Sequence, residues 1–105
     1  MGPEAVAVSN NQAKSRFESH IAGKIAFLSY RRSPGEIALT HAETPAELEG
    51  RGIGSAVVRA ALDFAREHSL KVVPACPFVV WYIREHQEYV DLVRTDHRVR
   101  VTTAL

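Results

Sequence analysis

The chain has 105 residues, which is enough for one domain and too short for two substrate-binding domains. Hydrophobic residues make up 46% of it and charged residues 24%, so a wholly disordered chain is excluded. Thirteen basic and twelve acidic residues nearly cancel, which argues against nucleic acid or an acidic membrane surface as a partner.

Two further features concern the cellular compartment. The longest apolar run, residues 78–83, is too short to cross a bilayer, and residues 1–11 lack the basic and apolar regions of a secretory signal. The single cysteine, Cys76, has no partner for an internal disulfide, which suits a reducing compartment. The sequence therefore predicts a cytoplasmic protein that does not enter a membrane.

Three strand-like segments follow a loose arm at residues 1–11. They are separated by short turns that contain glycine or proline, and they lie at 16–22, 24–31 and 36–43. In the third segment, the alternation of apolar and polar residues places His41 and Glu43 on the apolar face with Ile37 and Leu39. Short strands joined by tight turns predict an antiparallel meander.

The pattern then becomes helical. From Ile53 the apolar residues recur at helical spacing for about four turns, and a short apolar strand at 70–75 follows. Pro77 suits the first turn of a second helix, expected over 78–86 with one further turn at 89–93.

These elements give the order β-β-β-α-β-α, an α/β sandwich with a mostly antiparallel sheet. The last strand follows a crossover helix and is expected to run parallel to the third. We expect one domain at residues 12–95, between the flexible arm 1–11 and a C-terminal tail at 96–105. Residues 98–105 alternate weakly, so an added edge strand is the alternative to a frayed tail.

A glycine-rich turn lies between the third strand and the first helix, at residues 49–54. Its glycines let backbone N–H groups converge, and the start of the helix adds partial positive charge. Together these features predict a site for a phosphate group, with a plain strand-to-helix turn as the alternative. The turn lacks the lysine of a Walker loop and the third glycine of a dinucleotide-binding fingerprint, so both of those nucleotide loops are excluded.

The spacing of Gly52 and Gly54 after three strands resembles the pyrophosphate loop of the GNAT N-acetyltransferase superfamily. The signature of that loop is Gln/Arg-x-x-Gly-x-Gly/Ala. Glu49 departs from its first position, and Arg51 supplies a positive charge from a neighbouring position.

Other segments are similar to the small single-domain members of this superfamily, in which the usual N-terminal helices are missing. The similar segments are 41–45, 48–54, 72–79 and 82–93. The resemblance spans residues 16–93 and implies a minimal GNAT-like fold. Gln87 departs from it, at a position where those proteins usually have proline.

The resemblance implies that coenzyme A binds at the glycine-rich turn. Backbone N–H groups would hold the pyrophosphate, and the edge of the third strand would pair with the pantetheine arm as an added strand does. The residues assigned to this site are Ala42, Thr44, Glu49, Gly50, Arg51, Gly52, Ile53, Gly54 and Ser55. No metal is expected, because the five histidines show no metal-ligand spacing.

Acetyl transfer to an amine needs a base for the amine proton, a donor for the developing oxyanion and an acid for the departing thiolate. His41 and Glu43 are candidates for the base, with a core histidine and a solvated carboxylate as the alternatives. Cys76 is a candidate acyl-cysteine nucleophile or proton relay, with a small buried hydrophobe as the alternative. Tyr82 is a candidate acid for the thiolate, with aromatic packing as the alternative.

The sequence therefore predicts an enzyme that moves an acetyl group from acetyl-CoA to an amine by direct attack in a ternary complex. One alternative is a coenzyme A-binding module with little or no catalytic activity, because the acceptor-binding elements of larger relatives have no room here. Another is a small interaction domain that uses the exposed-looking aromatics Trp81 and Tyr82. We expect a monomer or weak homodimer that binds neither nucleic acid nor membrane.

Overall fold

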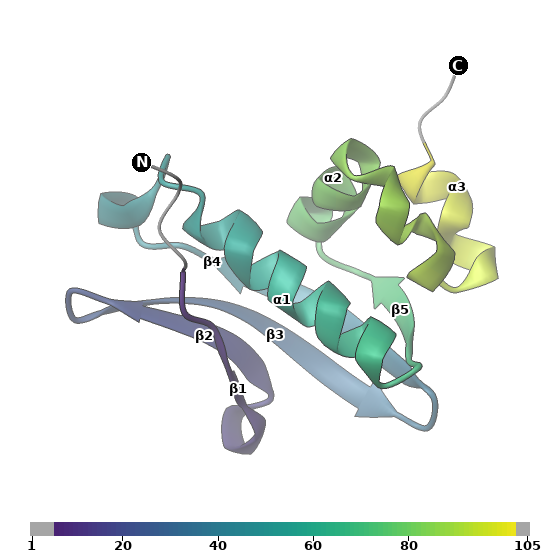
Figure 1. Cartoon of the computed structure of the whole chain (residues 1–105), viewed down its shortest axis with the longest axis horizontal. Coiled ribbons are helices and arrows are strands. Elements are labelled where there is room, and N and C mark those ends of the chain that lie inside the picture. Colours follow the sequence, from purple (N-terminus) through teal and green to yellow (C-terminus); the bar gives the residue numbers. More distant parts are fainter. Residues whose placement is uncertain (1–5, 103–105) are drawn as a thin grey trace.

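Five strands form one sheet in chain order in the computed structural model, which describes residues 6–102 (Figure 1). The strands are β1 Ser9–Asn11, β2 Arg16–Ile21, β3 Lys24–Ser33, β4 Glu36–Glu43 and β5 Lys71–Pro74. The pairs β1–β2, β2–β3 and β3–β4 are antiparallel, and β5 runs parallel to β4. The predicted antiparallel meander and the parallel last strand are therefore confirmed, and the fold is mixed α/β.

One long helix crosses the sheet, and the remaining helices lie beside it at the β5 edge (Figure 1). The α-helices are α1 Ile53–Glu67, α2 Pro77–Glu85 and α3 Arg98–Val101. Short 3-10 turns are η1 Gln12–Lys14, η2 Ala46–Leu48, η3 Gln87–Leu92 and η4 Thr95–His97. Between residues 6 and 102, no helix has the length and apolar character needed to span a membrane.

The core lies between α1 and the face of the sheet that this helix covers. Ala61 and Leu62 of α1 are fully buried, as are Leu28 of β3 and Leu39 of β4. Burying one such leucine side chain contributes about 2 kcal/mol, so this layer holds α1 at a fixed position on the sheet. The start of α1 is thereby fixed relative to the end of β4.

A β-bulge in β4 changes which side chains reach that core. Tyr30 of β3 pairs with Leu39, but its neighbour Ser29 pairs with His41, so Thr40 is an extra residue in β4. An extra residue shifts the alternation by one position. Leu39 and Ala42 therefore share the face that α1 covers, and His41 lies on the opposite, open face.

The predicted placement of His41 and Glu43 on the apolar face with Ile37 and Leu39 is therefore wrong. Leu39 is fully buried, whereas the side chains of His41 and Glu43 are 60% and 62% exposed. The alternation used for the prediction holds only in a strand without a bulge.

The N-terminal segment is more ordered than the loose arm expected at residues 1–11. Ser9–Asn11 forms β1 and pairs with β2, and the Tyr30 hydroxyl donates a hydrogen bond of 2.7 Å to Asn10 Oδ1. A strand of three residues is too short to show a periodic pattern, which explains why the sequence did not reveal it. The part of the arm at residues 1–5 lies outside the described residues.

The C-terminal segment also differs from expectation. A frayed tail was expected at 96–105, but η4 and α3 occupy most of this segment, and Val101 is fully buried. Gln87 fixes α3 by donating a hydrogen bond of 2.9 Å from its side-chain amide to the Val101 carbonyl oxygen. The prediction of a frayed tail is therefore wrong for residues 96–101, and residues 103–105 lie outside the described part of the chain.

A buried carboxylate on the open face of the sheet ties β1 to β2. Glu18 is 4% exposed and accepts hydrogen bonds from Asn11 Nδ2 at 3.0 Å, from His20 Nε2 at 2.8 Å and from Arg16 Nε. The hydrogen bonds from His20 and Arg16 lower the pKa of this carboxyl to about 2. Glu18 is therefore ionised in the folded protein throughout the physiological range.

We predict that Glu18→Gln destabilises the protein by about 1–3 kcal/mol at pH 7, because the charge-assisted hydrogen bonds are lost. The stabilisation is complete above the pKa of an unfolded glutamate, about 4.3, and is lost as the pH falls toward the folded value near 2. Urea unfolding of both proteins from pH 7 to pH 3 measures this difference, with Glu67→Gln as a surface control. A difference that stays constant down to pH 3 would contradict the assignment.

Candidate active site

An opening between β4 and β5 defines the site. The two strands pair only from Glu36 with Lys71 to Leu39 with Pro74. The Leu39 carbonyl oxygen then accepts hydrogen bonds from the N–H groups of both Ala75 and Cys76, each at 3.0 Å. Beyond this point the chain turns into α2, and within residues 6–102 the rest of β4 pairs only with β3.

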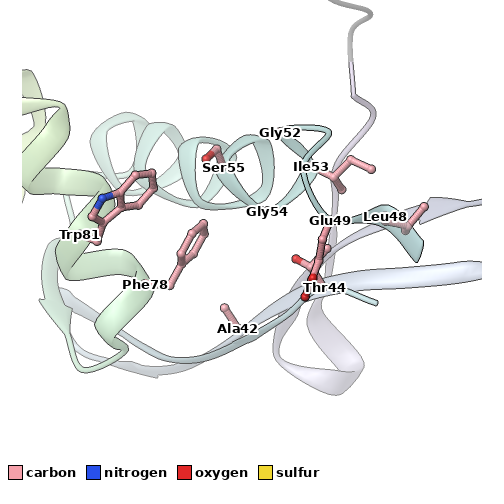
Figure 2. Close-up of a pocket in the computed structure, with 11 residues that line it drawn as sticks. Ala42, Thr44, Leu48, Glu49, Gly52, Ile53, Gly54, Ser55, Phe78 and Trp81 are labelled. Carbon is pink, nitrogen blue, oxygen red and sulfur yellow. The ribbon is translucent and has the colours of Figure 1, made fainter. Parts of the chain in front are cut away.

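A pocket of about 520 Å³ fills the space that this divergence leaves (Figure 2). The end of β4, the segment between η2 and α1, the first turn of α1 and one face of α2 surround it. The lining residues are Ala42, Thr44, Leu48, Glu49, Gly50, Gly52, Ile53, Gly54, Ser55, Phe78 and Trp81. All the residues predicted to bind the cofactor line this pocket except Arg51.

The start of α1 brings unpaired backbone donors to the pocket. Gly52 caps the helix with φ 76°, and the first intrahelical hydrogen bond runs from Ala56 N to Gly52 O at 3.0 Å. The N–H groups of Ile53, Gly54 and Ser55 therefore have no partner within the helix. Free amides and the positive end of the helix dipole form a site that favours an anion.

Gly54 keeps the pocket open. A Cβ atom at this position would lie 3.0 Å from Thr44 Oγ1 and 3.4 Å from the ring of Phe78. The first of these distances is shorter than ordinary van der Waals contact, so a side chain here would occupy the space between β4 and α2. Glycine is needed at positions 50 and 52 for a different reason. The φ angles of Gly50 and Gly52 are 81° and 76°, which are unfavourable for residues with a side chain.

Two aromatic side chains of α2 form a wall that the sequence did not reveal. Phe78 and Trp81 stack with ring centroids 5.4 Å apart, and both face the pocket in Figure 2. Trp81 is 48% exposed, an unusual state for so large an apolar group. Their spacing of three residues directly after Pro77 is the signal that would have placed them on one face of the helix.

The two candidates for the base lie together but outside the pocket. His41 Nε2 and Glu43 Oε2 are 2.9 Å apart, and both side chains project from the open face of the sheet. Ala42, between them, points to the other side and lines the pocket. The His41–Glu43 pair is thus separated from the pocket by the thickness of one strand.

Cys76 and Tyr82 are buried and do not line this pocket. Cys76 is 5% exposed at the cap of α2, directly after the divergence of β4 and β5. Tyr82 is 3% exposed and stacks on His86 at 4.0 Å, so the expectation of an exposed Tyr82 is wrong. Burial raises the pKa of the Tyr82 hydroxyl above its ordinary value.

A second hollow of about 1050 Å³ continues around the start of α1. It shares Gly52, Ile53 and Ser55 with the pocket and extends along the exposed side of the helix past Arg59. Arg51, the one predicted cofactor residue outside the pocket, lines this hollow. No group of three histidine, cysteine, aspartate or glutamate side chains that could hold a metal occurs among residues 6–102.

Known proteins share this sequence pattern and this fold. A sequence profile of the GCN5-related N-acetyl-transferases matches residues 16–92. Protein NATD1 from Gallus gallus and from Homo sapiens is 38% identical over 50 residues, or 48% of this chain. That alignment covers 46% of the Gallus gallus protein and 44% of the Homo sapiens protein, a little under half of each.

A solved structure supports the fold. The NMR structure of a GCN5-like protein from Staphylococcus aureus superposes with a TM-score of 0.67, over 87% of this chain and 90% of that one. The two sequences are 23% identical, so this likeness concerns the fold. Because the family profile covers most of the chain, from β2 to η3, the protein belongs to the GCN5-related N-acetyltransferases, a family of acyltransferases.

Proposed function

We propose that the protein transfers an acetyl group from acetyl-coenzyme A to an amine. The observation that carries this proposal is the pocket in which free amides at the start of α1 adjoin an unpaired strand edge on β4. Acetyl-coenzyme A matches both halves of this pocket, because it joins a diphosphate to a long arm that contains amides.

The diphosphate is assigned to the start of α1. The N–H groups of Ile53, Gly54 and Ser55 supply donors, and all three residues line the pocket directly after the left-handed Gly52. Glu49 adds a negative charge to the lining, so backbone donors must carry most of the binding here.

The pantetheine arm is assigned to the edge of β4. Ala42 and Thr44 line the pocket on the side where β5 has turned away. An extended chain with amide groups can add to such an edge as another strand would. Phe78 and Trp81 then cover the arm from the side of α2, which places the thioester near the divergence at Leu39 and Cys76.

The His41–Glu43 pair is assigned the role of base for an amine that arrives at the open face of the sheet. The amine nitrogen attacks the thioester carbonyl carbon, the C–N bond forms and the C–S bond breaks. The amine proton passes through water to His41, which lies on the other side of β4 from the pocket, while Glu43 holds the imidazole, and the thiolate leaves with a proton from solvent. Direct attack gives Cys76 no covalent role, and the burial and stacking of Tyr82 favour packing over proton donation.

A coenzyme A-binding module without turnover is the second candidate. It is favoured by one observation: none of the four predicted catalytic side chains lines the described pocket. The two functions differ in a single measurement, the release of free thiol when acetyl-coenzyme A and an amine are mixed with the protein.

We predict that Gly54→Val weakens acetyl-coenzyme A binding by at least about tenfold, because its methyl groups occupy the space between Thr44 and Phe78. The affinity of Gly54→Ala for acetyl-coenzyme A should lie between that of Gly54→Val and that of the native protein. Isothermal titration measures the affinities, and thermal unfolding checks that each variant is folded. Native protein that fails to bind millimolar acetyl-coenzyme A would overturn the proposed function.

We predict that His41→Ala lowers kcat about 100-fold and leaves the KM for acetyl-coenzyme A unchanged, because this side chain lies outside the pocket. Glu43→Gln should lower kcat less, since it removes only the partner of the imidazole. His68→Ala, at the far end of α1, serves as the matched control. Thiol release with a panel of amines measures the rates, and a His41→Ala enzyme with native kcat would remove this pair from the mechanism.

A further inference from the structure

One flank of α1 carries a positive charge beside the pocket. Arg59 follows Ser55 by four residues and precedes Arg66 by seven, so the three residues share one side of the helix. Arg66 shows where this side faces, because its guanidinium bonds to Asp91 at 3.0 Å and to the Glu88 carbonyl oxygen at 2.9 Å, both on η3. The flank therefore faces the layer formed by α2 and η3.

Arg59 is not neutralised within this layer. It is exposed, and residues 6–102 offer it no hydrogen bond or ion pair. Asp63, one turn further along α1, instead accepts a hydrogen bond of 2.9 Å from the Tyr89 hydroxyl. Arg59 lines the second hollow together with Tyr82 and His86, which places it on the side of α1 that faces α2.

A ligand bound at the proposed diphosphate site lies close to Arg59. Ser55 lines both the pocket and the second hollow, and Arg59 lies about one helical turn beyond Ser55 in that hollow. Figure 2 shows Ser55 on α1 and Trp81 on the neighbouring α2, and both residues line the pocket. A ligand anchored at the start of α1 can therefore extend along the helix toward Arg59.

We propose that Arg59 binds the 3′-phosphate of coenzyme A, so that the protein distinguishes coenzyme A from dephospho-coenzyme A. This inference rests on the proposed function, because it needs the diphosphate at the start of α1. The 3′-phosphate is carried by the ribose attached to that diphosphate, so it is the second anionic group that the ligand brings to this surface. A phosphate monoester is close to doubly charged at neutral pH, and a guanidinium pairs with two of its oxygens.

The expected gain is moderate because Arg59 is exposed. A charge-assisted pair at such a site is screened by salt, so the preference for coenzyme A should be about tenfold at low ionic strength and smaller at high ionic strength. Dephospho-coenzyme A keeps the diphosphate and the pantetheine arm, so its binding should not depend on Arg59.

Isothermal titration of coenzyme A and dephospho-coenzyme A into the native protein, Arg59→Gln and Arg31→Gln tests this assignment. Arg31 is an exposed arginine toward the β3–β4 turn, and its replacement changes the net charge equally. We expect native protein and Arg31→Gln to prefer coenzyme A about tenfold. We expect Arg59→Gln to bind both ligands with the native affinity for dephospho-coenzyme A.

The possible failures are distinguishable. If the native protein binds both ligands equally, or if Arg59→Gln keeps the preference for coenzyme A, the role of Arg59 is overturned and the proposed function stands. The same holds if Arg59→Gln weakens both ligands by the same factor, since that loss would not depend on the 3′-phosphate. If the native protein binds neither ligand, the proposed function itself fails, and the assignment of Arg59 falls with it.

Discussion

β5 pairs with β4 through only four residues and then turns away into α2, and this early divergence determines the rest of the site. A longer β5 would satisfy the edge of β4 and close the pocket. Instead, Leu39 accepts the last two hydrogen bonds from the chain that leaves, and the β-bulge at Thr40 follows immediately. The free strand edge and the bulge thus arise at the same point of the fold.

Three elements meet at this point, and each supplies a different kind of contact. β4 offers unpaired backbone, α1 offers the free amides of its first turn, and α2 offers the stacked rings of Phe78 and Trp81. The bulge has a further effect, because it moves His41 and Glu43 to the open face and brings Ala42 to the face of the pocket. In the proposed reaction the cofactor and the base therefore occupy opposite sides of one strand.

The fold and most of the pocket could be predicted from the sequence because their signals are local. Alternation marks β2 and β4, a run of residues that favour strands marks β3, helical spacing marks α1, and the glycines mark the turn that precedes it. The bulge at Thr40 has no such signal, since it depends on the register between β3 and β4, and the face of His41 was predicted wrongly for that reason. The wall formed by Phe78 and Trp81 depends in the same way on how α2 packs against α1.

Binding of acetyl-coenzyme A along β4 and at the start of α1 is the central claim, and an NMR titration of ¹⁵N-labelled protein tests it most directly. We expect the largest amide shifts at residues 42–44 and 50–55 and at the indole N–H of Trp81, while the amide signals of β1 and of the β3–β4 turn stay unchanged. Shifts confined to other surfaces, or no shifts at saturating ligand, would contradict it.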